Sequence, residues 1–228
     1  MSEKPSNSPP VRIQAAFGFI DLAGFTALTE EHGDEDAAAL ATRFARVARG
    51  CLGEGDRLVK SIGDAVLVTS PTAESGVTLV ERLLTEAAAD ARFPPLRAGL
   101  HFGDAIRRDG DVFGHAVNLA ARVAGEAHAG EVLGTAPIAA AARKVGIAVA
   151  DLGAVNLKNV SGAVPLFSLA LVLGATETPV DPVCQAAVDR RAAVGHLRYA
   201  EREYWFCSLT CAAAFASNPA WHAKPPPE

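Results

Sequence analysis

Two aspartates follow apolar segments, and their placement suits a divalent cation. Asp21 ends the segment "VRIQAAFGFID", in which apolar residues alternate, and Asp64 lies in the turn of "VKSIGDAVLV". If the strands formed by these segments pair in one sheet, the two carboxylates meet at one edge of it. Hard cations such as Mg²⁺ bind one or two carboxylates and share their other ligands with water and substrate phosphates. Each aspartate taken alone is better explained by helix capping or turn chemistry.

Two further groups of residues have the chemistry needed to bind a nucleotide. The segment "LAGFTAL" enters a helix, where free backbone amides at Gly24 and Phe25 would cradle a phosphate, with Thr26 as the expected N-cap. In "DGDVFGHAVNLAAR", Asn118 and Arg122 lie four residues apart and therefore on one helix face. An amide and a guanidinium on one face can hold a ribose and a polyphosphate, although a solvated face with an Asn cap explains the same spacing.

The elements that would position these residues follow a known supersecondary order. Apolar periodicity predicts a strand, a helix, a strand pair, a helix and a strand, over 11–21, 24–50, 56–70, 72–91 and 94–103. This β-α-β-β-α-β order from Gln14 to Gly103 is the ferredoxin-like arrangement. A helix, a strand, a helix and two strands follow, over 116–127, 131–135, 136–144, 147–153 and 163–169. The expected fold class is therefore α+β, with appended strands and helices.

A change of composition divides the chain into a large domain and a small appendage. Small residues and Pro in "GATETPV" mark a linker, and the segment beyond it carries both Trp and both Tyr. Cys184, Cys207 and Cys211 also gather there, and in a reducing compartment such a cluster indicates metal or redox chemistry. The expected divisions are a mobile tail, a main domain, a linker, a small cysteine-containing domain and a C-terminal tail, over 1–13, 14–172, 173–180, 181–222 and 223–228.

The composition excludes several classes of function. Of the 228 residues, 50% are hydrophobic and 21% are charged, which is typical of a globular chain and not of a disordered one. The net charge of -5 provides no global field to attract nucleic acid, so none is expected as a partner. The first ten residues lack the apolar segment of a signal peptide, and no apolar run is long enough to cross a bilayer. We therefore expect a cytoplasmic protein without a membrane span.

Five blocks of the sequence resemble, in order and at suitable intervals, the signature of the class III nucleotidyl cyclases. They are "FIDLAGFT", "VKSIGDAVLV", "RAGLHFG", "DGDVFGHAVNLAAR" and "LKNVSGAVPLFSL". The resemblance implies a cyclase homology domain that converts ATP to 3',5'-cyclic AMP and pyrophosphate. The metal-assisted reaction would be an in-line attack of the ribose 3'-hydroxyl on the α-phosphate.

The resemblance also implies roles for individual residues. Asp21 and Asp64 match the two metal-binding aspartates of the family, which hold two Mg²⁺ or Mn²⁺ ions per site. Lys60 and Asp111 match the pair that selects adenine, with the Lys near the purine N1 and the Asp near the exocyclic amine. The residues implied to contact the substrate elsewhere are Asn118 for the ribose, Arg122 for the transition state, Lys158 for the terminal phosphates, and Phe25 with Thr26.

The resemblance implies a homodimer as well. In this family the active site forms between two subunits, with the metal-binding aspartates from one chain and the base-selecting, ribose-binding and arginine residues from the other. A single chain that carries both sets would make two such sites as a symmetric pair.

The small C-terminal domain resembles the YHS domain and the related TRASH-type metal-binding modules through "DPVC", "YWFCSLTC" and "FASNPAWH". Thiolates at Cys184, Cys207 and Cys211 would supply three ligands of a Zn²⁺ or Cu⁺ site, with His196 and His222 as candidates for the fourth. The alternative is that the cysteines are small core residues. If metal orders this domain, the expected role is that of a sensor that regulates the cyclase.

Two alternatives to an adenylate cyclase, and one alternative for the C-terminal domain, stay open. A guanylate cyclase is disfavoured by Lys60 with Asp111, because guanylyl cyclases place other residues there. A catalytically silent nucleotide-binding or metal-sensing module is disfavoured because all six matched positions of the active site are present. In the third alternative, the C-terminal domain docks a partner protein and binds no metal.

Overall fold

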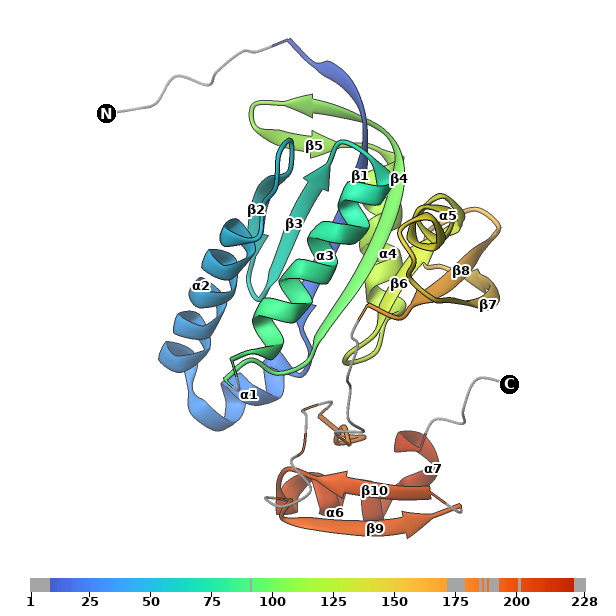
Figure 1. Cartoon of the computed structure of the whole chain (residues 1–228). Helices are drawn as coiled ribbons and strands as arrows, with labels where there is room; N and C mark the ends of the chain where they lie inside the picture. The colour runs from blue at the N-terminus through green and yellow to red at the C-terminus, as the bar shows by residue number, and fades with distance from the viewer. Residues whose placement is uncertain are drawn as a thin grey trace.

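The computed structural model describes residues 9–90, 92–171, 179–184, 186, 188, 193–200 and 202–223 (Figure 1). Residues 1–8 and 224–228 of the predicted tails, and 173–178 of the predicted linker, lie outside these ranges. The first strand begins at Val11, so the predicted tail over 1–13 extends too far. Among the described residues, none of the helices combines the length and the apolar character needed to cross a membrane.

The larger body is built on one twisted sheet. Its strands are β1 (Val11–Leu22), β2 (Arg57–Ile62), β3 (Ala65–Ser70), β4 (Leu96–Arg108), β5 (Asp111–Phe113), β6 (Val132–Thr135), β7 (Val149–Asn156) and β8 (Ala163–Leu169). The strand order is β2-β3-β1-β4-β6-β8-β7, and β5 pairs with β4. The first four strands of this order are antiparallel neighbours, which confirms the ferredoxin-like arrangement. β6 joins β4 in parallel and begins the appended part.

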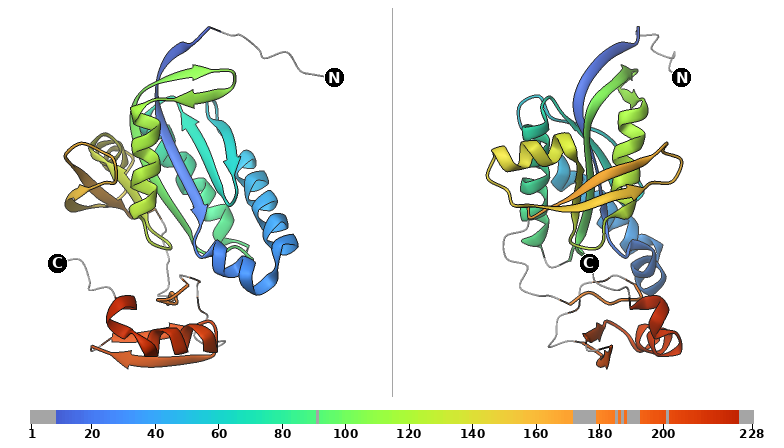
Figure 2. Two further views of the ribbon diagram at one scale, coloured as in Figure 1. Left: turned by 180° about the vertical axis from the view of Figure 1, so that it is seen from behind. Right: turned by 90° about the vertical axis from the view of Figure 1, so that its right-hand side faces the viewer.

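Helices cover both faces of this sheet (Figure 2). The helices α2 (Asp34–Gly50), α3 (Ala73–Ala88) and α5 (Ala136–Lys144) share one core with the sheet, and α4 (His115–Glu126) shares another. Ile20 of β1 lies in the first core and Phe17 in the second, because residues three apart on a strand face opposite sides. The alternating pattern of β1 therefore serves two apolar layers at once.

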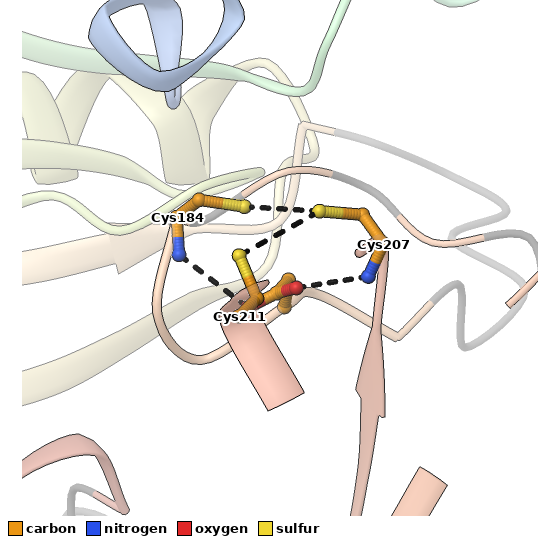
Figure 3. A group of neighbouring side chains, drawn as sticks. Cys184, Cys207 and Cys211 are labelled. Carbon is orange, nitrogen blue, oxygen red and sulfur yellow. Dashed lines mark hydrogen bonds between the residues drawn. The ribbon is translucent and has the colours of Figure 1, made fainter. Parts of the chain in front are cut away.

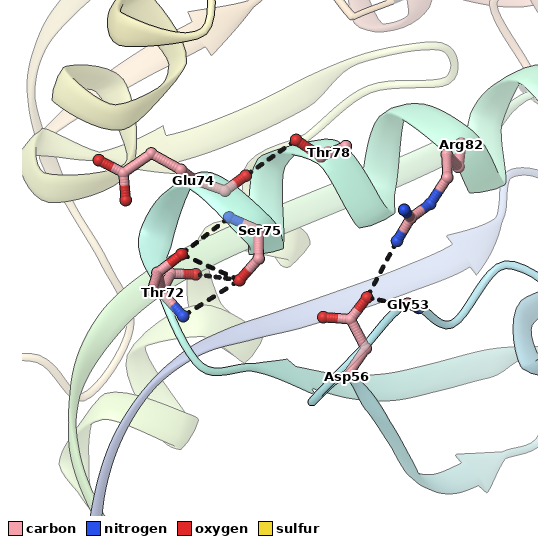
Figure 4. A network of polar contacts seen from close by, with 7 residues as sticks. All are labelled: Gly53, Asp56, Thr72, Glu74, Ser75, Thr78 and Arg82. Atoms are coloured by element: carbon pink, nitrogen blue, oxygen red, sulfur yellow. Dashed lines mark hydrogen bonds and ion pairs between the residues drawn. The ribbon is translucent and has the colours of Figure 1, made fainter.

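Polar side chains cap the start of α3 and join this helix to the loop before β2 (Figure 4). Thr72 is the N-cap of α3, where its hydroxyl accepts a hydrogen bond from the Ser75 amide at 3.0 Å and the Ser75 hydroxyl accepts one from the Thr72 amide. The buried carboxylate of Asp56 accepts hydrogen bonds from the Gly53 amide at 2.8 Å and from Arg82 of α3 at 2.9 Å. The loop that leads into β2 is therefore attached to the helix that covers it.

The helix predicted over 24–50 is two helices in the structure. α1 (Phe25–His32) and α2 meet at Gly33, whose φ of 87° lies in the region that favours glycine. The expected N-cap was also wrong, because Gly24 occupies that position and Thr26 lies within the first turn of α1. The predicted end at Gly50 is confirmed.

A β-hairpin that the apolar pattern did not predict places Asp111. β4 extends to Arg108, and β5 returns from Asp111 after a turn at Asp109 and Gly110 with φ angles of 50° and 80°. Positive φ at both turn residues is typical of a two-residue hairpin turn, for which Asp-Gly is a preferred sequence. The local signal "DG" was present, but three residues of strand are too few to show alternation.

The smaller body is a β-hairpin followed by two helices. It consists of β9 (Gly195–Tyr199), β10 (Arg202–Phe206), α6 (Leu209–Ser217) and α7 (Pro219–His222). Phe206 and Phe215 are fully buried, with ring centroids 5.3 Å apart, and Cys211 completes their core. The aromatic residues that mark this segment in the sequence are therefore used to build a small separate core.

Gly99 allows α4 to approach the sheet, and we expect Gly99→Ala to lower the free energy of unfolding by about 3 kcal/mol. A methyl group at Gly99 would come within 2.0 Å of the Ala124 amide nitrogen on α4, and backbone cannot move aside cheaply. Chemical denaturation of both proteins would measure the change. Gly125→Ala on α4 is the control, because its methyl group meets no atom within 4 Å. It should raise the free energy of unfolding by about 0.5–1 kcal/mol. A Gly99→Ala chain as stable as wild type would contradict the packing described.

Candidate functional site

Asp21, Asp64 and Arg97 meet at one edge of the sheet, where β1 enters α1. Asp21 pairs with Ala65 of β3 on one side and with Arg97 of β4 on the other. The Arg97 guanidinium donates two hydrogen bonds to the Asp21 carboxylate, from Nε at 2.6 Å and from Nη2 at 2.9 Å. Asp64 immediately precedes Ala65, so the register places the two aspartates at the same end of the neighbouring strands β1 and β3.

Two carboxylates and one guanidinium set the charge at this edge. Burial raises the pKa of Asp64 and the negative charge of Asp21 adds to this effect, whereas the positive charge of Arg97 opposes it. A divalent cation between the two carboxylates would stabilise their charged forms. Two half-buried carboxylates provide the oxygen ligands that hard cations prefer. Asp21 and Asp64 therefore fit a divalent cation such as Mg²⁺.

Arg97 is the residue at this edge that sequence reasoning missed. It lies in the quoted block "RAGLHFG" and immediately precedes an apolar core residue, Ala98, which is fully buried. Only the register of β1 against β4 shows that this arginine stands opposite Asp21. The sequence shows a charged residue near the start of a predicted strand, but this position does not indicate which residue it contacts.

Lys60 and Asp111 form the second group. The Lys60 ammonium donates to the Asp111 carboxylate at 2.7 Å, although one residue is on β2 and the other begins β5. Partial burial alone would raise the pKa of Asp111, but the hydrogen bonds from Lys60 and from the Val112 amide hold it below its usual value. Lys60 pairs with Leu67, a core residue on the α4 side, so this pair belongs to that face of the sheet.

The structure does not join the other predicted residues to these two groups. Asn118 and Arg122 are exposed on one face of α4, and among the described residues neither side chain has a hydrogen-bond or ion-pair partner. Lys158 is exposed in the connection between β7 and β8. Their common feature is that each presents its polar group to solvent.

Phe25 and Thr26 begin α1 beside the two carboxylates. The Phe25 side chain packs against the main core, so any contact of this residue with a substrate would come from its backbone. Both residues line a cavity of about 440 Å³ that also exposes Asp64 and Arg97. The start of a helix next to paired carboxylates is a suitable place for a metal-bound polyphosphate.

The three C-terminal cysteines converge on one point (Figure 3). The Cys184 and Cys207 sulfurs are 3.4 Å apart, and those of Cys207 and Cys211 are 3.9 Å apart. Together with a carboxylate oxygen of Asp181, these atoms lie within 4.8 Å of one another. All four cysteines of the chain are free thiols, so none of the three clustered sulfurs is committed to a disulfide.

The fourth group at this thiol cluster is Asp181, not one of the histidines proposed from the sequence. The His196 ring stacks on Trp205 at 4.7 Å, and the His222 ring lies 6.2 Å from Phe215, so both belong to aromatic packing. Asp181 is fully buried, and its carboxylate accepts hydrogen bonds from the Val183 and Cys207 amides, each at 2.9 Å. Asp181 lies three residues before Cys184, and this proximity is the feature of the sequence that could have indicated its place at the thiol cluster.

Comparison with known proteins addresses the larger body. The chain is 39% identical over 132 residues to the pH-sensitive adenylate cyclase MT1302 of Mycobacterium tuberculosis, which covers 58% of this chain and 33% of that protein. It is 38% identical over 125 residues to an adenylate cyclase of Glutamicibacter nicotianae, covering 54% of this chain and 31% of that protein. The chain therefore spans about a third of the length of these relatives.

Solved structures share the fold at lower identity. The adenylyl cyclase CyaB from P. aeruginosa has a TM-score of 0.60 at 23% identity and covers 74% of this chain and 98% of its own. The guanylate cyclase domain of RhGC from Catenaria anguillulae, solved in complex with GTP, has a TM-score of 0.57 at 17% identity and covers 72% and 98%. Proteins named adenylyl cyclase and guanylate cyclase thus share this fold, which therefore does not by itself distinguish the two activities. Residues 12–170 match the family described as the adenylate and guanylate cyclase catalytic domain, and the chain belongs to this family.

Proposed function

We propose that the chain is an adenylate cyclase that converts ATP to 3',5'-cyclic AMP and pyrophosphate. The observation that carries the choice of base is the Lys60–Asp111 pair, joined at 2.7 Å. A cation that donates and a carboxylate that accepts match the N1 and exocyclic amine of adenine, whereas guanine presents the reverse pattern at these positions. The curated relatives named adenylate cyclase support the same choice.

In the proposed reaction, the ribose 3'-oxygen forms a bond to the α-phosphorus as the bond from that phosphorus to the pyrophosphate oxygen breaks. The hydroxyl proton passes to solvent, and pyrophosphate leaves. Asp21 and Asp64 would hold two Mg²⁺ or Mn²⁺ ions, which when bound favour ionisation of the hydroxyl and neutralise phosphate charge. The backbone at Phe25 and Thr26 would bind the phosphates at the start of α1.

The exposed residues complete the site from a second copy of the chain. Arg122 would stabilise charge that grows on the phosphoryl oxygens, Asn118 would orient the ribose, and Lys158 would bind the terminal phosphates. These side chains have no partner within the described part of one chain, which supports a homodimer in which they face the carboxylates of the partner subunit.

The test of the proposed function is product formation by the purified full-length chain. ATP and GTP are supplied separately, each with Mg²⁺ and with Mn²⁺, and cyclic nucleotides are separated and identified. Cyclic AMP from ATP, with little product from GTP, is the expected result. An excess of cyclic GMP formed from GTP would favour a guanylate cyclase. No product from a folded chain would favour a silent regulatory module.

Removal of either base-selecting side chain should reduce discrimination between ATP and GTP. We expect Lys60→Ala and Asp111→Ala each to lower kcat/KM for ATP about 100-fold while changing the value for GTP little. The double variant should lose less than the product of the two effects, because the side chains contact each other. Steady-state kinetics with both nucleotides measure this.

Lys144→Ala is the matched control for this prediction. Lys144 forms an exposed ion pair of 3.0 Å with Glu74, and neither residue belongs to the base-selecting pair. Its kinetics should equal those of the wild type. Equal losses for ATP and GTP in the Lys60 and Asp111 variants would mean that the pair does not read the base.

We also propose that the C-terminal body is a YHS-like module that binds Zn²⁺ or Cu⁺ through Cys184, Cys207 and Cys211. Three sulfurs within reach of one ion support this, and Asp181 either completes the ligands or holds the two cysteine-bearing turns through its amide contacts. The free thiols support the proposed cytoplasmic location as well.

Metal binding at this cluster should strengthen as pH rises. Burial raises the pKa of Cys184 to about 11, and burial together with Cys184 and Asp181 raises that of Cys207, so both thiols carry protons at neutral pH. Each must lose its proton on ligation, so affinity should rise about tenfold per pH unit for each proton released. Competition with a zinc indicator between pH 6 and 8 measures the slope. Cys207→Ser should abolish binding and Cys51→Ser should not; a flat pH profile would contradict thiolate ligation.

A further inference from the structure

The turn that carries Cys184 lies directly against the start of α1. Gly24, the N-cap of α1, has a φ of 76°, and a methyl group there would come within 2.5 Å of the Cys184 carbonyl oxygen and 3.5 Å of the Ala186 amide nitrogen. The larger and smaller bodies thus meet backbone to backbone at this point. A glycine is required both by the contact and by the backbone conformation.

The two bodies also enclose one cavity between them. Asp64, Arg97 and Thr26 line the cavity of about 440 Å³ from the larger body, and Cys184, Cys211 and Ala214 line it from the smaller one. The thiol cluster and the carboxylate edge therefore open onto the same space. Any change at the cysteines that moves their turn alters the wall opposite Asp64.

A carbonyl oxygen at this position competes with a phosphate. The start of a helix carries partial positive charge, and Gly24 at the N-cap has no side chain with which to cap the first amides of α1. The Cys184 carbonyl oxygen is the negative end of a peptide dipole and lies against that start. A phosphate bound at the start of α1 would have to displace it, because the carbonyl occupies the space against Gly24 that the phosphate would enter.

We propose that the docked C-terminal module is an autoinhibitory wall, in which the Cys184 turn restrains binding of substrate phosphates at the start of α1. The thiol cluster controls this wall, since Cys184 belongs both to the turn and to the cluster. The proposal rests on the proposed function for its consequence, which is that displacement of the module raises cyclase activity. A thiophilic ion that fixes the cysteines would set how firmly the wall is held.

The first test follows alkylation of Cys184 by iodoacetamide in the full chain, with peptide mass spectrometry as the readout. Magnesium tripolyphosphate is the probe, and a chelator selective for zinc and copper keeps the thiols free. Because phosphate and module compete, the probe should accelerate alkylation of Cys184 by at least about threefold. Cys51, buried in the main core, is the internal reference and should not change. An unchanged or slower rate at Cys184 would overturn the proposal.

The second test places a charge on the module side of the cavity. Ala214→Glu would face Asp64, Glu30 and Arg97 across the cavity. Because the Arg97 guanidinium is already paired with Asp21, repulsion from the two carboxylates should dominate and displace the module. Cys184 should then react fast without the probe, and cyclic AMP formation should rise several-fold. Ala213→Glu, exposed on the same helix, is the control and should match the wild type in both readouts. If Ala214→Glu also matches the wild type, the cavity contact is not the restraint.

The two readouts separate this proposal from the proposed function. Wild-type chain that makes cyclic AMP while Ala214→Glu changes neither readout would retain the function and reject the autoinhibitory wall. A chain that makes no cyclic nucleotide, but in which tripolyphosphate still accelerates Cys184 alkylation, would reject the cyclase and retain the competition.

Discussion

Asp64→Asn is expected to lower kcat/KM for cyclic AMP formation by about a thousandfold or more. Asparagine keeps the size and the turn of the native residue but removes the negative charge that would hold a divalent ion opposite Asp21. The remaining Asp21 carboxylate shares its charge with Arg97 through two hydrogen bonds, so by itself it would hold a divalent ion only weakly. Cyclic AMP formation with Mg²⁺ and with Mn²⁺, measured over a range of ion concentrations, tests the prediction. If saturating metal restored the activity, Asp64→Asn would only weaken metal binding, and the predicted thousandfold loss would be wrong.

The same substitution should not destabilise the fold, which separates a catalytic effect from unfolding. The pKa of Asp64 is raised in the folded chain, so its charged form is the one that the fold disfavours. The contribution of such a group to stability is fully present below its unfolded pKa, near 3.8, and is lost as pH rises through the folded value. At neutral pH, Asp64→Asn removes an unfavourable charge and should unfold at the same or a higher temperature. A lower unfolding temperature at pH 7 would contradict this account.

Asp104→Asn is the matched control for activity. Asp104 is an exposed aspartate of β4 that accepts a hydrogen bond from Gln14 at 3.2 Å, and it belongs to neither group of site residues. Its cyclase activity should equal that of the wild type. A comparable loss in Asp104→Asn would mean that the sheet tolerates no neutral substitution and that the effect at Asp64 is not specific.

The parts of this molecule that could be predicted from the sequence are those encoded over a few neighbouring residues. Alternation placed β1, and the helix predicted over 136–144 coincides with α5. The break at Gly33 was missed because the apolar pattern continues across it, and only a φ of 87° separates the two helices. Local pattern therefore defines the elements better than it defines their interruptions.

The site was predictable only as far as single motifs describe it. Asp21 and Asp64 could be placed together because one ends a strand and the other lies in the turn of a strand pair. Arg97, which is 76 residues from Asp21, becomes its partner only through the register of β1 against β4. Asp181 was missed for a different reason, because a buried carboxylate held by backbone amides is unusual, and histidine is the more common ligand beside cysteines. Both omissions concern partners that tertiary structure selects.

A mixture of two inactive variants should recover about a quarter of the wild-type activity if the active site is shared between subunits. Asp21→Ala removes a metal ligand and Arg122→Ala removes the proposed transition-state arginine, so each homodimer lacks one of these groups at both sites. Random exchange gives about half heterodimers, in which one site has both groups and the other has neither. The expected recovery follows from that single intact site.

The geometry of one chain is the physical basis of this prediction. Asp21 is held at the β1 edge by Arg97, whereas Arg122 is exposed on α4 without a partner in the described part of the chain. Activity is measured after the variants are mixed, and again after co-expression so that slow exchange does not conceal recovery. Asp21→Ala mixed with Asp64→Ala is the control and should stay inactive, because both substitutions damage the same half of the site. If the first mixture also stays inactive although heterodimers form, each chain completes its own site and the shared arrangement is wrong.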